Sequence, residues 1–478
     1  MRLETLRLKN FRGYEDSEFR LHPQFNLIVG ENGAGKTSFL EAAAVAIGSW
    51  MLGIRGHDSR NILERDVRVV REIVEKRYRE LPQYPVRVEA TGFVHVAVVK
   101  RSDDGVLDYP PSRDSSQPNP REEAVAWSRS IEGIGGRSTR SGANSLKKLA
   151  EFMAMALLTQ QPRIFPLIRY FGAGRLWELV RDSDGKALSK HKGKQPAELA
   201  QDADELDQWL LHVDKLSEPF YGYRMSVDKR CNPDDLIRWM AFERRNELDE
   251  GEESPALRLV YQAIESLLPE AESVRYSVKL RTLVLNHRDG QRHTFNELSD
   301  GYRNVVAIAA DLAIKAAMLN PQLAEKALEW TPGVVLIDEL DLHLHPKWQR
   351  RIIEDLRRTF PKIQFICTTH SPFLIQSLRS GEELIMLEGQ PTAQVDNMPI
   401  DEIARGLMGV SNTETSARYD EMKQVAKAYL EKLEEADLTP ADKLDDFLDH
   451  LAQSIAPYAD NPAFQAFLEM KRAAKLGR

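Results

Sequence analysis

A glycine-rich segment near the N-terminus has the residue types and spacing that bind phosphate. Leu27 to Val29 is an apolar run suited to a buried strand, and the following residues fit G-x-x-x-x-G-K-[ST] at every fixed position. Glycine backbone N–H groups, the ammonium of Lys36 and the N-terminus of the next helix suit a phosphate group, and Thr37 is placed to hold Mg²⁺. The alternative is a glycine-rich turn without a ligand. The predicted phosphate-binding residues are Gly30, Glu31, Asn32, Gly33, Ala34, Gly35, Lys36, Thr37 and Ser38.

Two carboxylates follow a second apolar run, from Val334 to Ile337. Asp338 and Glu339 form a Walker B pattern, in which the first acid reaches the Mg²⁺ shell and the second orients and deprotonates the attacking water. A pair of acids at the end of a strand can also cap a turn. The complete phosphate loop upstream favours the catalytic interpretation, so the sequence predicts hydrolysis of ATP with Mg²⁺ as the metal.

Two further side chains stand where an anion is favoured. Ser299 precedes a long alanine-rich helical pattern, where its hydroxyl and the helix N-terminus suit an anion, although serine is also an ordinary capping residue. His370 leaves an apolar run from Phe365 to Thr369. It is either a sensor of the γ-phosphate or a turn residue, and we favour the sensor.

The length, net charge and cysteine content of the chain exclude several classes of protein. A chain of 478 residues is too long for one core and predicts two or three domains. The formal net charge of -8 gives the chain no overall basic surface for nucleic acid. Cys231 and Cys367 lack companions at metal-ligand spacing, which suits buried, unpaired thiols in a reducing compartment. The N-terminus has no signal-like apolar core, so we expect a cytoplasmic protein without a membrane segment.

The chemistry requires a core of strands and helices that brings these distant motifs together. Short strand-like runs on both sides of Arg12 predict an antiparallel pair before the phosphate loop. We expect an ATPase core formed by 1–50 and 290–400, an inserted α+β region at 51–289 and a helical region at 401–478. The predicted fold class is α/β with a mixed sheet.

Three segments of the predicted insertion have their own patterns. Ile62 to Glu80 is dense in both charges and predicts a solvated helix face rather than a nucleic-acid patch. Gly133 to Lys148 has four basic residues and no acid, which makes it the best local candidate for contact with nucleic acid. Leu199 to Leu268 is dominated by helical patterns and predicts a helical lid.

The C-terminal region has apolar residues at helical spacing. One predicted helix places Met422, Val425, Tyr429 and Leu433 on one face, and a second begins at Thr439. A third has an apolar face made by Phe464, Phe467 and Leu468. These helices form either a small bundle packed on the core or a surface for a partner protein.

In order, the motifs NFR, GENGAGKT, LSDGYR, IDELDLHLHP and TTHSP resemble those of the ATP-binding-cassette ATPases. The resemblance is to the branch of the overcoming-lysogenization, RecF-like and SMC-like proteins. It implies an ABC-type P-loop core in which Arg12 lies near the nucleotide, Asp341 faces a partner subunit and His370 contacts the γ-phosphate.

The same resemblance implies two composite sites in a head-to-tail homodimer. The signature residues Ser299 and Gly301 of one subunit would complete the ATP site of the other, although Asp300 replaces the family's glycine between them. The Q-loop glutamine has two candidates by position alone, Gln160 and Gln161.

Three further segments are similar to the ATPase subunit of Septu-type anti-phage systems, which is also found with some retrons. These segments are IRYFGAGRLW, GYRMSVDKRCNP and the final NPAFQAFLEMKRAAKLGR. The resemblance implies a separately encoded HNH nuclease partner that cuts nucleic acid when phage is sensed. For the chain as a whole we expect a homodimer or a larger assembly such as a hexamer.

Other functions stay open at this point. A RecF-like or SMC-like repair ATPase would bind DNA directly and need no nuclease partner. An intrinsic nuclease of the overcoming-lysogenization type is disfavoured, because Glu388 and Gly389 are followed by no D-x-D motif. A transporter subunit is disfavoured by the long insertion and by the LHLHP segment.

Overall fold

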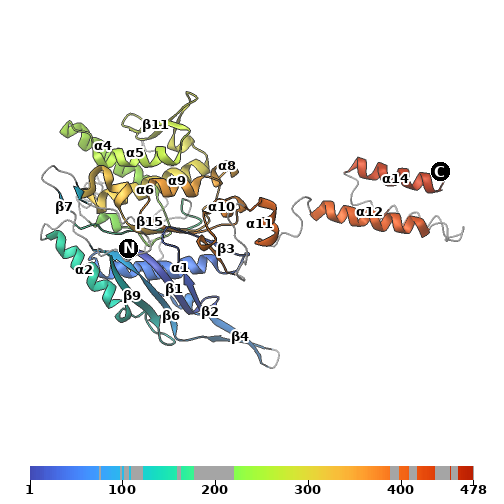
Figure 1. Cartoon of the computed structure of the whole chain (residues 1–478), viewed down its shortest axis with the longest axis horizontal. Helices are drawn as coiled ribbons and strands as arrows, with labels where there is room; N and C mark the ends of the chain where they lie inside the picture. Colours follow the sequence, from blue (N-terminus) through green and yellow to red (C-terminus); the bar gives the residue numbers. More distant parts are fainter. Residues whose placement is uncertain are drawn as a thin grey trace, which may run out of the picture. The chain divides into compact units, whose positions relative to one another are not determined.

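A parallel sheet and an antiparallel sheet enclose a central helix in the first of two compact units, residues 1–398 (Figure 1). The second unit is formed by residues 399–478. The computed structural model describes residues 1–74, 77–96, 100–101, 107–108, 122–158, 163–176, 220–387, 398–408, 417–435, 453 and 461–476.

The five strands of the parallel sheet have the order β10-β14-β15-β3-β16. Every residue of these strands is buried, because helices cover both faces and the strands are nearly continuous apolar runs. The buried strands predicted before the phosphate loop and the Walker B acids are therefore confirmed. Their bounds are β3 Phe25–Val29, β10 Leu167–Phe171, β14 Gly333–Ile337, β15 Ile363–Thr368 and β16 Leu384–Met386.

The antiparallel sheet has the order β2-β1-β6-β9. The predicted strand pair around Arg12 is confirmed, since Phe11 of the first strand lies opposite Tyr14 of the second. Strands β6, β9 and β10 come from the region 51–289, which we expected to be inserted, and they extend both sheets. The bounds are β1 Arg2–Phe11, β2 Tyr14–Arg20, β6 Val86–His95 and β9 Glu122–Ile131.

Helix α1, Lys36–Gly48, lies between the two sheets (Figure 1). It is buried at every position from Phe39 to Gly48, because its sequence is apolar on all sides apart from Glu41. The indole of Trp127 on β9 donates to the carbonyl of Ala46 at 2.9 Å and ties the antiparallel sheet to this helix. The phosphate loop is thereby fixed to a helix that is held from both sides.

The opposite face of the parallel sheet is covered by other helices, among them α5, α6 and α9 (Figure 1). The helical patterns predicted before residue 268 are confirmed for α4 and α5, but α5 packs on α6 of the core. Residues 199–219 of the expected lid lie outside the described residues. The bounds are α2 Asn144–Leu158, α4 Pro233–Glu250, α5 Pro255–Leu267, α6 Asp300–Leu319, α7 Ala327–Trp330, α8 Pro346–Gln349, α9 Ile352–Thr359 and α10 Pro372–Gln376.

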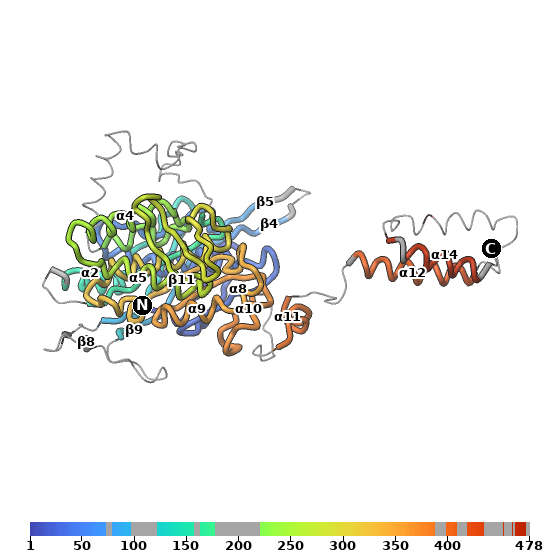
Figure 2. Tube along the Cα trace, turned by 90° about the horizontal axis from the view of Figure 1, so that it is seen from above, coloured from blue at the N-terminus to red at the C-terminus, as the bar shows by residue number. Residues whose placement is uncertain are grey.

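Small antiparallel ribbons complete this unit, and one of them corrects a prediction. The helix face predicted over Ile62 to Glu80 is wrong, because the segment forms the hairpin of β4 and β5 (Figure 2). Its β-branched residues favour a strand, and its mixed charges pair across the ribbon, as in the 3.1 Å contact of Arg71 with Glu80. The bounds are β4 Val69–Val74, β5 Arg77–Pro82, β7 Lys100–Arg101, β8 Leu107–Asp108, β11 Ala271–Ser277, β12 Thr282–His287 and β13 Arg292–Thr294.

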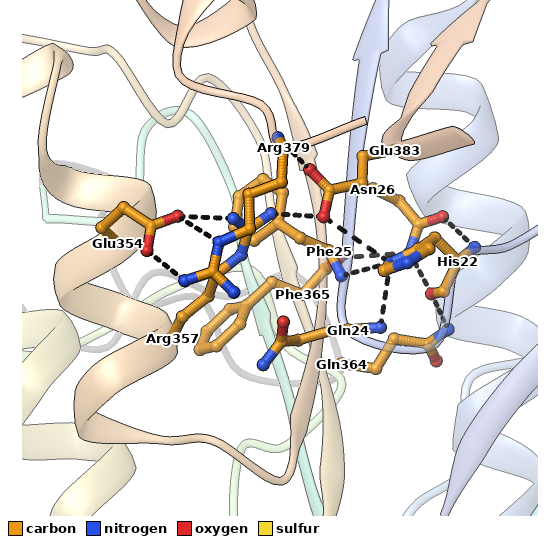
Figure 3. A network of polar contacts seen from close by, with 10 residues as sticks. All are labelled: His22, Gln24, Phe25, Asn26, Glu354, Arg357, Gln364, Phe365, Arg379 and Glu383. Atoms are coloured by element: carbon orange, nitrogen blue, oxygen red, sulfur yellow. Dashed lines mark hydrogen bonds and ion pairs between the residues drawn. The ribbon is translucent and has the colours of Figure 1, made fainter. Parts of the chain in front are cut away.

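A polar network closes the amino end of the parallel sheet (Figure 3). Arg357 pairs with the buried Glu383 at 2.6 Å, and the Gln364 side chain exchanges hydrogen bonds of 2.7 and 2.8 Å with the backbone of Leu3. Burial lowers the pKa of His22, whose Nδ1 accepts backbone N–H groups at the start of β3. These contacts fix the end of the sheet opposite to the phosphate loop.

The second unit contains α11 Ile400–Gly406, α12 Ala417–Glu435 and α14 Pro462–Leu476. Tyr429 and Leu433 of α12 pack against Leu468 of α14, which confirms most of the predicted apolar faces. Phe467 is an exception at 43% exposed. The helix predicted from Thr439 lies outside the described residues. Among the residues that the structure describes, no helix is long and apolar enough to cross a membrane.

Candidate nucleotide-binding site

The phosphate loop joins the end of β3 to the start of α1. Gly33 and Gly35 have φ values of 92° and 101°, in the left-handed region that glycine tolerates. A Cβ on Gly35 would lie 3.1 Å from the hydroxyl of Tyr14, which donates to the Gly35 carbonyl at 3.1 Å. The glycine is therefore required both by the turn and by the close approach of β2.

The Lys36 ammonium lies inside the phosphate loop. It donates to the carbonyls of Gly30 and Glu31 at 2.8 and 2.9 Å, and its side chain is 8% exposed. The loop thus concentrates a positive charge at the start of α1, whose first backbone N–H groups have no partner within the helix. This arrangement suits a phosphate group.

The structure brings Thr37 to the Walker B acids, 301 residues away in the chain. The Thr37 hydroxyl donates to Asp338 Oδ2 at 3.0 Å, and Thr368 donates to Oδ1 at 2.7 Å. Hydroxyl and carboxylate oxygens suit Mg²⁺, and neighbouring ligands at its usual bond length are about 2.9 Å apart, so this pair fits the metal. Within the described part of the chain no three His, Cys, Asp or Glu residues cluster, and Mg²⁺ requires no such cluster when phosphates and water supply its other ligands.

Glu339 follows in a strained backbone conformation. Its φ is 51°, which is rare for a residue with a side chain, and its N–H donates to the Thr368 hydroxyl at 2.8 Å. The side chain is half-buried, beside the end of β14. A strained residue fixed in this way is common at catalytic positions.

Arg175 is a site residue that the sequence analysis missed. It is 2% exposed and donates to the carbonyls of Asp338 at 2.9 Å and Glu339 at 3.4 Å. A third bond, of 3.0 Å, goes to the Gly172 carbonyl at the end of β10. Burial lowers the pKa of Arg175. The sequence feature that could have identified Arg175 is its place directly after a glycine-rich turn that ends an apolar strand.

The segment after β15 joins the Walker B loop to the phosphate loop. Thr369 donates its hydroxyl proton to Asp341 at 2.6 Å and its backbone N–H to the carbonyl of Ile28 at 3.3 Å. His370 is the next residue and is exposed. Because β15 lies between β14 and β3, His370 leaves the sheet between the Walker B acids and the phosphate loop.

The signature segment, which is the LSDGYR motif at residues 298–303, is fixed to the loop after the Walker B acids. A Cβ on Gly301 would lie 2.4 Å from the carbonyl of His343, and the Tyr302 ring packs on Trp348 at 4.2 Å. Ser299 has the backbone conformation of a helix N-cap, but its side chain makes no capping hydrogen bond and is exposed. The capping role is absent, which leaves the hydroxyl able to meet a ligand.

Arg12 lies at the turn between β1 and β2. Its φ is 49°, and its guanidinium pairs at 2.7 Å with Asp66, which is 1% exposed. Asp66 is a second residue that the sequence analysis missed, because nothing in the charge-dense segment distinguished it. Gln160 and Gln161 lie outside the described residues, whereas Cys231 and Cys367 are buried and free, as predicted.

Two models of known protein families match the chain. A family model described as "AAA domain" matches residues 5–270, and one described as "AAA domain, putative AbiEii toxin, Type IV TA system" matches residues 232–376. Among solved structures, the SmcHead bound to the C-winged helix domain of ScpA has a TM-score of 0.40 and 16% identity, covering 81% of this chain and 94% of that chain.

The curated relatives include proteins named for retrons and for Septu. The Retron Vc95 probable ATPase of Vibrio cholerae serotype O1 biovar El Tor is 28% identical over 272 residues, 50% of this chain and 52% of that protein. The Retron Ec83 probable ATPase of Escherichia coli is 26% identical over 421 residues, 82% of this chain and 72% of that protein. The Septu protein PtuA of Bacillus mycoides (strain KBAB4) is 44% identical over 94 residues, 20% of this chain and 12% of that protein. The match thus spans about half of the first relative and a small part of the third.

Proposed function

Since the chain belongs to the AAA-domain family of ATPases, we propose that it hydrolyses ATP and regulates a separately encoded HNH nuclease in an anti-phage defence complex. The ATPase part rests on the 3.0 Å contact between the Thr37 hydroxyl and Asp338, with Glu339 next in the chain. The defence part is supported by the relatives named for retrons and Septu.

Each site residue has a defined task in this proposal. Lys36 and the loop N–H groups bind the phosphates, Thr37 and Asp338 hold Mg²⁺, and Glu339 accepts the proton of the attacking water. When bound, Mg²⁺ stabilises the charge on the phosphate oxygens. In a head-to-tail homodimer, the partner subunit contributes its own copies of the signature and Walker B loop residues, which are Ser299, Gly301 and Asp341. His370 contacts the γ-phosphate, and Arg12 borders the nucleotide.

The C-terminal unit is the proposed docking surface for the nuclease. Its helices expose large apolar side chains, with Tyr419 at 42%, Phe467 at 43% and Met470 at 64%. The small core of the same helix pair is formed by other residues, Tyr429, Leu433 and Leu468. Exposed apolar side chains of this kind support a protein partner.

Co-purification tests this proposal. The tagged chain is expressed with its neighbouring genes, isolated with and without ATP, and assayed for DNA cleavage. We expect a bound HNH protein that is lost when residues 413–478 are deleted or when Phe467 and Met470 are both changed to Ser. Leu248→Ser is the matched control, because Leu248 is 60% exposed on α4 in the first unit.

Two outcomes would contradict parts of the proposal. A chain recovered alone that binds DNA directly would favour a RecF-like repair ATPase. A Lys36→Ala variant that hydrolyses ATP at the wild-type rate would exclude the phosphate loop as the hydrolytic site.

A further inference from the structure

A large polar cavity lies beside α1, away from the phosphate loop. Two segments line it, 56–60 with Arg65 and 223–230, and its volume is about 870 Å³. This volume is within the range of small-molecule sites, roughly 300–1,000 Å³. None of the residues 30–37 is among those that line it. We call it the basic cavity.

Positive charge predominates around the basic cavity. Glu41 of α1 is 1% exposed, and its carboxylate pairs with both Arg60 and Lys229. Counting Glu41 with the charged residues of the lining gives five cations and three carboxylates, which are Arg60, Arg65, Arg224, Lys229 and Arg230 against Glu41, Asp58 and Asp228. The cavity therefore favours an anion.

Two buried polar groups in the wall have no hydrogen-bond partner among the residues that the structure describes. Ser226 is 2% exposed and its Oγ makes no hydrogen bond. The Nε of Arg60 is also buried without a hydrogen-bond acceptor. Buried polar groups are nearly always satisfied, so both indicate a ligand that can accept their protons.

The wall of the cavity is fixed from behind by two buried cations. Arg169 is 1% exposed and pairs with Asp311 at 2.6 Å. It donates at 2.6 Å to each of three wall carbonyls, those of Met225, Asp228 and Arg230. Lys315 donates to the carbonyls of Gly222 at 3.0 Å and Arg224 at 2.6 Å.

This support holds the wall in a conformation that the segment would not adopt by itself. Met225 has a φ of 59°, an unfavourable value for a residue with a side chain. Because the backbone is already ordered, the protein loses little conformational entropy when a ligand binds. The basic cavity is therefore a preorganised site.

We propose that the basic cavity binds a small phosphate ester of nucleotide size, at a site separate from the phosphate loop. The phosphate accepts protons from Ser226 and Arg60, and the rim residues Arg65 and Arg224 add charge. Glu41 follows Thr37 by one helical turn, so a ligand that draws Arg60 or Lys229 from Glu41 acts on the same helix that holds the nucleotide.

Calorimetric titration of the full-length Lys36→Ala variant tests this site without the phosphate loop. The probes are the four common nucleoside 5′-monophosphates, with the corresponding nucleosides as phosphate-free controls, at 0.15 M salt so that distant charges are screened. We expect at least one monophosphate to bind with one site per chain, and its nucleoside to bind at least about tenfold more weakly.

Variants of the cavity then locate the bound ligand. Changing both Arg65 and Arg224 to Gln is expected to weaken binding about tenfold or more, and Ser226→Ala several-fold. The matched control changes Arg71 and Arg79 to Gln, which removes the same charge from the hairpin of β4 and β5 and is expected to have no effect.

Three results would overturn the proposal. One is that no monophosphate binds the Lys36→Ala variant, and another is that the hairpin variant loses as much affinity as the cavity variant. The third is that only oligonucleotides bind, with or without a 5′-phosphate, which would make the cavity part of a nucleic-acid surface.

Discussion

The Walker B carboxylates are positioned by two residues to which the sequence analysis gave no role, Thr368 and Arg175. Thr368 donates its hydroxyl proton to Asp338 and accepts the N–H of Glu339, so one side chain orients both acids. Arg175 binds the carbonyls of the same two residues. Together these contacts hold the positive φ of Glu339, and the strain at this residue is balanced by hydrogen bonds on both sides.

The role of Glu339 as general base predicts the effect of removing its basicity. Glu339→Gln should lower kcat for ATP hydrolysis by about 10²–10⁴, because the amide keeps the shape but accepts no proton. ATP affinity should stay within a few-fold in an equilibrium binding assay. Glu252→Gln, an exposed change on the same unit, should leave kcat unchanged. Hydrolysis at the wild-type rate by Glu339→Gln would remove the base assignment.

The position of Arg175 predicts a change in kcat with little change in KM. Arg175→Lys keeps the charge, but one ammonium cannot reproduce the three carbonyl contacts, so we expect kcat to fall about tenfold through misplacement of Glu339. The free energy of unfolding should fall by about 1–3 kcal/mol, since buried carbonyls lose donors. Steady-state kinetics and denaturant unfolding measure the two effects.

A second buried arginine provides a control that distinguishes an effect on the position of Glu339 from an effect on stability alone. Arg129 is fully buried and donates to the Thr139 carbonyl at 2.7 Å. Arg129→Lys should lower stability and leave kcat unchanged. If Arg175→Lys behaves in the same way, Arg175 has a structural role alone.

At the scale of elements, α6 and the loop after β14 act as one piece. Gly301 in the first turn of α6 contacts the His343 carbonyl, and Tyr302 packs on Trp348 at the start of α8. The signature segment and the loop that carries Asp341 therefore move together. In the proposed dimer, both would face the partner subunit from one rigid surface.

This contact predicts that Gly301→Ala separates nucleotide binding from hydrolysis. A Cβ 2.4 Å from a carbonyl oxygen forces α6 or the loop to shift, and a misplacement of about 1 Å can cost on the order of 100-fold in rate. We expect at least about a tenfold loss of kcat and weaker ATP-dependent dimerisation in analytical ultracentrifugation, with ATP binding retained.

The control for Gly301→Ala is another glycine in a helix. Gly406 ends α11, and nothing lies within 4 Å of a Cβ built there. Gly406→Ala should therefore leave hydrolysis and dimerisation unchanged. A Gly301→Ala protein that dimerises and hydrolyses ATP normally would show that this contact does not hold the signature segment in place.

At the scale of the whole molecule, the proposed site is divided between two copies of the chain. The phosphate loop, the Walker B acids and His370 meet at the carboxyl edge of one parallel sheet. Ser299 instead stands at the exposed start of α6, with its hydroxyl in no capping bond. This division agrees with composite sites in a head-to-tail dimer.

Mixing two inactive variants tests the division. Lys36→Ala and Ser299→Arg should each abolish most hydrolysis, whereas an exchanged mixture should recover up to about a quarter of the wild-type rate. The reason is that half of the dimers are then mixed, and each mixed dimer has one intact composite site. A mixture that stays inactive, although native mass spectrometry detects mixed dimers, would place both residues in the same subunit's site.

The local sequence determined those structural elements that are formed by neighbouring residues in the chain. The phosphate loop with its strand and helix, the buried β14 before Asp338 and the antiparallel pair around Arg12 were predicted because each pattern lies within about two dozen residues. The same local reasoning failed for Ile62 to Glu80, since mixed charges suit both a helix face and a cross-strand ladder.

Only the tertiary structure decided which distant residues meet. The contacts of Arg175 with the Walker B carbonyls, of Asp66 with Arg12 and of Arg169 with the wall of the basic cavity join segments 54 to 164 residues apart. A local pattern does not identify the partners of a buried arginine that binds backbone carbonyls, because every residue type supplies the same carbonyl. Sequence therefore determined the chemical groups of the site, and the packing of the two sheets around α1 determined how they are held.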